Sequence, residues 1–167
     1  LSISFLKPQT CTTIAPGGEW GTNIFSCTGG ATPATASSII INHPVSISGQ
    51  TITLNQRVSI TLNNSLTFNK TGPNDAQLIL SNNSSTIHVA SMGALVNGPG
   101  GANNLVQIGS RQFVGNDFSS ITTQRPVTLS ANGLPVTLVR LNAVAASQSV
   151  EISFSTATEL NNSHFAI

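Results

Sequence analysis

The chain contains few charged and few aromatic side chains. Of its 167 residues only 7% are Asp, Glu, Lys or Arg; Tyr is absent, and Trp and Met occur once each. Ordinary globular domains carry about 25% charged residues. Because Lys, Glu and Arg form most exposed helix faces, their scarcity argues against a helical domain. Ile, Leu, Val and Phe are frequent and periodic, which argues against disorder. The composition therefore predicts an all-β protein.

The low charge also bears on partners. Six basic and five acidic residues are scattered singly and leave a net charge of +1. Without a basic stripe, a nucleic-acid partner is not expected. Without an acidic cluster or a histidine spaced to bind zinc with a cysteine, no metal and no cofactor are expected either. No apolar run approaches the roughly 20 residues that span a bilayer, so we expect no membrane span.

The two cysteines, Cys11 and Cys27, lie sixteen residues apart. They are either two buried free thiols or a disulfide. The uncharged, Ser/Thr/Asn-rich surroundings are typical of extracellular proteins, in which disulfides persist. A bond between these positions would contribute about 3 kcal/mol by restricting the unfolded chain. We therefore predict a Cys11–Cys27 disulfide and an extracellular or cell-surface location.

A long alternating stretch, IIINHPVSISGQTITLNQRVSITLNNSLTF, covers residues 39–68, and Arg57 is its only fixed charge. Short strand patterns separated by Asn, Gly or Ser continue to about residue 109 and recur at roughly 20 residues, which is typical of a solenoid. We predict a right-handed parallel β-helix (β-solenoid). A β-sandwich has similar strand spacing and remains an alternative. The coils that fit loosely are 39–50, 51–69, 77–90 and 94–109.

In a solenoid each strand pairs with the coil above and below, and alternate side chains point into a narrow core. Like charges stacked about 4.8 Å apart would repel, which explains an uncharged outer face. The expected inward residues are Ile40, Val45, Ile47, Ile52, Leu54, Ile60, Leu62, Leu66 and Phe68.

The pattern divides the chain into four parts. We expect an N-terminal strand and disulfide-stapled cap at 1–37, the β-solenoid at 38–114, a linker at 115–133 and a second β unit at 134–167. In the last part, two alternating strands flank a turn near residues 147–149.

Residues 134–167 resemble part of a known protein family. The stretch LPVTLVRLNAVAASQSVEISFSTATELNNSHFAI (134–167) includes Leu134–Val136, Ser155–Glu159, Asn161–Asn162 and Phe165. It resembles the start of a fibronectin-III-like module found near the C-terminus of large secreted surface proteins of Bacteroidota. Phe154 stands where that family usually has Trp.

Residues 39–68 resemble the N-terminal β-helical region of the same proteins, which use a type IX-like export route. The resemblance implies a partial immunoglobulin/fibronectin-III-like β-sandwich at 134–167. It also implies an adhesin, stalk or fibre rather than an enzyme.

Candidate catalytic residues are sparse. Asp75 and Asp117 both lie in Gly/Pro/Asn-rich loops, where Asp usually forms turns. His43 precedes Pro44 and fits a strand corner, His88 belongs to an alternating strand, and His164 lies in the fibronectin-like part. No nucleophile has a recognisable context such as G-x-S-x-G. We therefore predict no catalytic residues.

The first residues, LSISFLKPQ, are either the tail of a secretory signal or a strand with Leu1, Ile3 and Phe5 on one side. As a strand, this segment of one copy can complete an open sheet edge in the next and form a head-to-tail homo-oligomer or filament. The alternative function is a carbohydrate-binding or non-catalytic module of a polysaccharide-acting enzyme. Glycan binding of this kind needs aromatic platforms, and Trp20 is the candidate.

Overall fold

The computed structural model describes residues 9–131, 138–146 and 149–156. The chain divides into two units, Leu1–Asn132 and Gly133–Ile167, and each is described by itself. Within the described ranges, no helix has the length and apolar character needed to cross a membrane.

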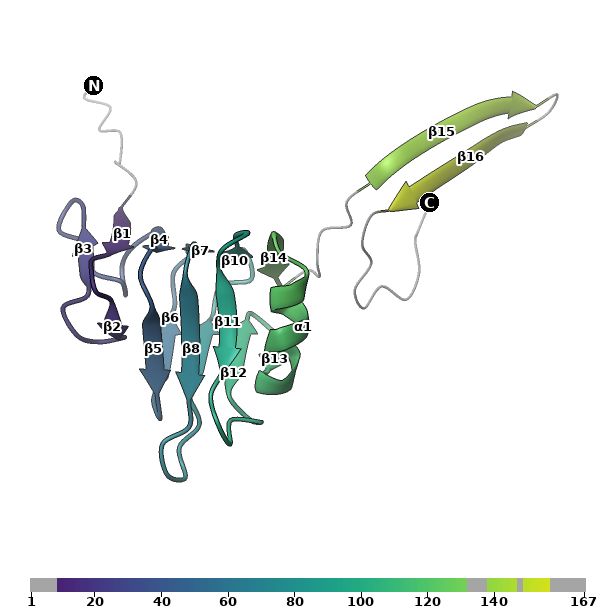
Figure 1. Cartoon of the computed structure of the whole chain (residues 1–167). Coiled ribbons are helices and arrows are strands. Elements are labelled where there is room, and N and C mark those ends of the chain that lie inside the picture. The colour runs from purple at the N-terminus through teal and green to yellow at the C-terminus, as the bar shows by residue number, and fades with distance from the viewer. Residues whose placement is uncertain (1–8, 132–137, 147–148, 157–167) are drawn as a thin grey trace, which may run out of the picture. The chain divides into compact units, whose positions relative to one another are not determined.

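Unit 1 is an all-β solenoid of about four turns (Figure 1). Three sheets run along it. Sheet 1 contains, in spatial order, β3 (Phe25–Cys27), β1 (Thr10–Thr13), β4 (Ser38–Ile41), β7 (Ser59–Leu62), β10 (Thr86–Val89) and β14 (Val127–Ser130). Sheet 2 contains β2 (Gly18–Glu19), β5 (Val45–Ser48), β8 (Ser65–Asn69) and β11 (Ala94–Asn97). Sheet 3 contains β6 (Thr51–Leu54), β9 (Gln77–Leu80), β12 (Leu105–Ile108) and β13 (Arg111–Val114).

Each full coil passes once through all three sheets, and its strands pair in parallel with those of the next coil. The coils are β4–β5–β6, β7–β8–β9 and β10–β11–β12, so the expected boundaries at 39–50, 51–69, 77–90 and 94–109 are wrong. Ser38 pairs with Ser59 and Ser59 with Thr86, separations of 21 and 27 residues. Turns of unequal length between strands therefore hide the repeat in the sequence.

The core is a stack of alternate side chains with no exposed surface, among them Ile39, Ile41, Ile47, Ile60, Leu62, Leu66, Phe68, Leu78, Leu80, Ile87 and Val89. The expectation that Ile40 points inward is wrong. In the run Ser38–Ile41 the pairing decides the register, because Ile39 stacks on Ile60 and Ile41 on Leu62. Ile52 is only partly buried, because β6 is the outermost strand of sheet 3.

The segment 115–133 was expected to be a linker, but its described part, residues 115–131, covers the C-terminal end of the solenoid. It contains η1 (Gly115–Asp117), α1 (Phe118–Thr123) and β14. β14 pairs antiparallel with β10, just as β13 pairs with β12. The fully buried Phe118 places its ring 5.0 Å from that of Phe68.

α1 closes the end of sheet 2, where no further strand is added. The Thr122 hydroxyl accepts from the Leu95 N–H (3.1 Å) and donates to the Leu95 carbonyl (3.0 Å). Arg125 donates to the carbonyl of Gly93 (2.8 Å). The three strands of the last full coil are thus covered by β14, α1 and β13, which is how solenoids protect their last coil.

In unit 2, β15 (Leu138–Ala146) and β16 (Ser149–Thr156) form an antiparallel hairpin, as the alternating pattern predicted. The resemblance residues 134–136 and 157–165 lie outside the described residues. The fibronectin-III-like module therefore stays a prediction.

Candidate functional site

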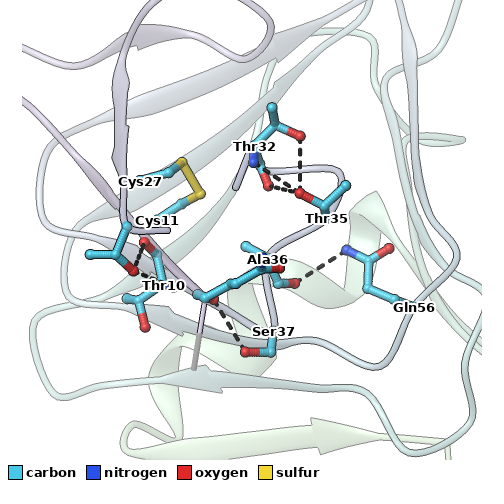
Figure 2. The surroundings of a disulfide bond; sticks show 10 residues. Thr10, Cys11, Cys27, Thr32, Thr35, Ala36, Ser37 and Gln56 are labelled. Carbon is cyan, nitrogen blue, oxygen red and sulfur yellow. Dashed lines mark hydrogen bonds between the residues drawn. A yellow bond between two sulfur atoms is a disulfide. The ribbon is translucent and has the colours of Figure 1, made fainter. Parts of the chain in front are cut away.

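A disulfide joins Cys11 of β1 to Cys27 of β3 at the N-terminal end of the solenoid (Figure 2). The two residues face each other directly in an antiparallel pair, with their Cα atoms 4.0 Å apart. Cys11 is fully buried. The predicted disulfide is therefore confirmed, and the free-thiol alternative is excluded. It fastens β3 to the outer side of β1.

After β3 the chain returns to β4 through a loop that is held on both sides (Figure 2). The backbone N–H groups of Ser37 and Ser38 donate to the Gln9 carbonyl at 2.9 and 3.2 Å. On the other side, Gln56 Nε2 donates to the Ala36 carbonyl at 3.2 Å. The chain at 36–37 therefore lies between the start of β1 and the corner that follows β6.

This path leaves the first coil without a strand in sheet 3. From β2 the chain turns back to β3 in sheet 1, so among the described strands β9 is the only neighbour of β6 in the sheet. The N–H groups of Gln77 and Ser81 donate to the carbonyls of Gln50 and Leu54. Because peptide groups alternate sides along a parallel strand, those of Thr51 and Thr53 point away from β9.

A groove of about 530 Å³ lies along this free edge. Its walls are β6, the Trp20–Asn23 turn, Phe25, Cys27 and the loop 31–34. Trp20 packs edge-on against Phe25, with ring centroids 5.1 Å apart. None of the described residues that line the groove is charged. It therefore suits an uncharged, extended segment with apolar side chains.

Glu19 holds one wall of the groove in place. Its carboxylate accepts hydrogen bonds from Ser46 Oγ (2.6 Å), Ser48 N (2.7 Å), Ser48 Oγ (3.0 Å) and Gln50 Nε2 (2.8 Å). Gln50 also donates to the Trp20 carbonyl at 3.0 Å. Burial by itself raises the pKa of Glu19, but the hydrogen bonds from Ser46, Ser48 and Gln50 outweigh it and lower the pKa below the ordinary value.

The lowered pKa of Glu19 predicts a pH-dependent stability. Unfolded Glu19 binds a proton near pH 4.3, and the folded protein binds it only at lower pH. The hydrogen bonds therefore stabilise the fold fully above about pH 5 and lose this effect as the pH falls through the folded pKa. Urea unfolding between pH 3 and 7 should show a smaller loss for Glu19→Gln than for the native chain. Parallel pH profiles for the two proteins would contradict this account.

The two loop aspartates occupy separate local contacts. Asp75 forms an ion pair with Lys70 at 3.0 Å, and Asp117 accepts from the backbone N–H of Val114 at 3.1 Å. Both contacts stabilise turns. Across the described part of the chain, no group of three or more His, Cys, Asp and Glu residues is arranged to hold a metal ion.

The histidines also have structural partners. His43 lies in the corner between β4 and β5, as predicted, with Nδ1 3.0 Å from the Thr13 carbonyl. His88 Nδ1 lies 3.0 Å from the Thr128 hydroxyl, between β10 and β14. His164 and the predicted donor residues Leu1, Ile3 and Phe5 lie outside the described residues.

Neither the groove nor the cluster of hydrogen bonds around Glu19 was predicted from the sequence. Ser46, Ser48 and Gln50 alternate on one outer face, and a lone Glu beside the only Trp was a usable signal for that cluster. The groove had no such signal, because it depends on where the chain turns back.

Comparison of the chain with family models, with curated proteins and with solved structures finds no match in any of the three. The family resemblance therefore stays a prediction.

Proposed function

We propose that this chain is a non-enzymatic structural segment of an extracellular or cell-surface protein, a stalk, an adhesin or a filament subunit, that associates with other copies. The observation that carries the proposal is that the strands at one end of the solenoid are covered, whereas one strand at the other end is not. At the C-terminal end β14, α1 and β13 cover the strands of the last full coil, β10, β11 and β12. At the other end no described strand pairs with the outer edge of β6, and the described residues lining the groove along it are uncharged.

Two further features support a structural role. Consecutive coils share parallel backbone pairing in every sheet around a fully buried apolar stack, which makes the solenoid stiff. The Cys11–Cys27 disulfide suits an oxidising compartment such as the cell exterior. The titratable side chains discussed above bind local structural partners.

Light scattering and negative-stain imaging of the purified chain test this proposal. We expect dimers or larger assemblies at micromolar concentration, and no release of reducing ends from a panel of polysaccharides. A chain that stays monomeric across the concentration range contradicts the self-association, and polysaccharide turnover contradicts the non-enzymatic role.

Carbohydrate binding is the second candidate, because Trp20 and the hydroxyl-bearing Thr51 and Thr53 line the same groove. Trp20 is only 4% exposed and packs against Phe25, so it offers a sugar ring little surface to stack on. Titrating soluble glycans while following Trp20 fluorescence separates the two functions. A saturable shift without turnover supports a binding module, and an unchanged spectrum excludes binding beside Trp20.

A further inference from the structure

We infer that the groove along β6 receives the segment Leu1–Leu6 of a second copy of this chain, and that the exchange is reciprocal. The inference rests on the proposed function and names the partner of its open edge.

The backbone of β6 can pair with a further strand on the groove side. The N–H and C=O groups of Thr51 and Thr53 point toward the groove, since β9 occupies the other side of the strand. A free edge of this kind accepts an extended segment by strand addition, in which backbone hydrogen bonds give affinity and alternate side-chain pockets give specificity.

The side chains of Leu1–Leu6 match those that line the groove. Leu1–Leu6 reads LSISFL, without charge and with Leu1, Ile3 and Phe5 on alternate positions. The groove is uncharged and bordered by Trp20, Phe25 and the partly buried Ile52. One face of the segment can therefore cover the end of the apolar stack, while Ser2 and Ser4 face water.

The position of Gln9 indicates which copy supplies the segment. In its own chain Leu1–Leu6 is tied to Gln9, and the Gln9 carbonyl is bound by the N–H groups of Ser37 and Ser38. The loop that ends there is bound on its other side by Gln56, at the corner after β6. The loop 31–37 thus lies between Gln9 and the groove, and only residues 7–9 join Leu1–Leu6 to β1. A second copy meets no such barrier.

The expected assembly is a closed dimer. The donor segment precedes β1 and the acceptor is the first strand of sheet 3, so both belong to the N-terminal end of the solenoid. Two copies that exchange segments at the same end satisfy each other and close around a two-fold axis. This differs from the head-to-tail filament predicted from the sequence.

A matched pair of donor variants tests the inference. Ile3→Asp places a charge on the apolar face of the segment, and Ser4→Asp places the same charge on the polar face. Because burying an unpaired charge is costly, Ile3→Asp should weaken dimerisation by at least about tenfold, whereas Ser4→Asp should change it little. Analytical ultracentrifugation of the two full-length variants measures both constants.

The acceptor is tested by Thr53→Pro. Proline removes the N–H that points into the groove but no N–H bound to β9, and edge strands tolerate it on their open side. Thr53→Val keeps the N–H and is the control. We expect Thr53→Pro to be monomeric with a native circular dichroism spectrum. If that variant does not fold, a labelled LSISFLKP peptide added to the chain lacking residues 1–6 tests the same edge, with saturable binding expected.

The outcomes separate this inference from the proposed function. Assemblies that persist unchanged in Ile3→Asp and in the chain lacking residues 1–6 overturn the groove assignment and leave self-association standing. A strictly monomeric native chain overturns both. A monomer whose Thr53 amide loses hydrogen-exchange protection when residues 1–6 are deleted shows that the chain fills its own groove, which overturns the second-copy assignment.

Discussion

Replacing Asn104 with alanine is expected to destabilise unit 1 by about 2 kcal/mol, because the buried N–H of Ala76 loses its partner, whereas the Phe68 carbonyl keeps the N–H of Gly98 at 2.8 Å. Asn104 has no exposed surface. Its Oδ1 accepts from the Ala76 N–H at 2.8 Å, and its Nδ2 donates to the carbonyl of Phe68 at 2.8 Å and to Asn97 Oδ1 at 2.9 Å. One amide thus joins the connection between β8 and β9 to the corner after β11.

Urea unfolding followed by circular dichroism measures this loss. Asn103→Ala is the matched control, since its side chain is exposed and its replacement should change the free energy of unfolding by no more than about 0.5 kcal/mol. Equal midpoints for Asn103→Ala and Asn104→Ala would falsify the role assigned to the buried amide.

Removing the disulfide through the double substitution Cys11→Ala and Cys27→Ala is expected to cost about 3 kcal/mol, because the unfolded chain loses a crosslink over sixteen residues. In a domain of this size such a loss lowers the melting temperature by roughly 10 °C. Cys27 also lines the groove, so the wall formed by β3 should loosen.

Scanning calorimetry with and without reductant checks this prediction. Reductant should lower the melting temperature of the native chain to that of the double variant and leave the double variant unchanged. If reduction leaves the melting temperature of the native chain where it was, the loop after Cys27 is held by its hydrogen bonds to Gln9 and Gln56 alone.

The amino-acid sequence by itself determined the fold class of unit 1. A chain with 7% charged residues and apolar residues at every second position has few ways to bury Leu62, Leu66 and Phe68 other than stacked strands. The same pattern predicted the β15–β16 hairpin and, with the composition, the disulfide. Local alternation carries this information because the side-chain period of a strand is two wherever the strand lies.

The register of the strands and the covering of the solenoid's C-terminal end were decided only by the tertiary structure. Three successive isoleucines, Ile39–Ile41, fit either face, and pairing with β7 chose the outer two for the core. The segment 115–133 was predicted to be a linker because the short helix at 118–123 and the turns around it have no long-range period. Their role appeared only when Phe118 reached Phe68 and Thr122 reached Leu95.

The candidate site is likewise a feature that only the tertiary structure decides. Where the chain leaves sheet 2 after Glu19 and returns to sheet 1 is set by packing of Trp20 on Phe25 and by the bond between Cys11 and Cys27. Alternation in the sequence tells which residues of β6 face inward. Whether β6 has a neighbour depends on residues far away in the sequence, and so only the folded chain shows that no described strand pairs with its outer edge.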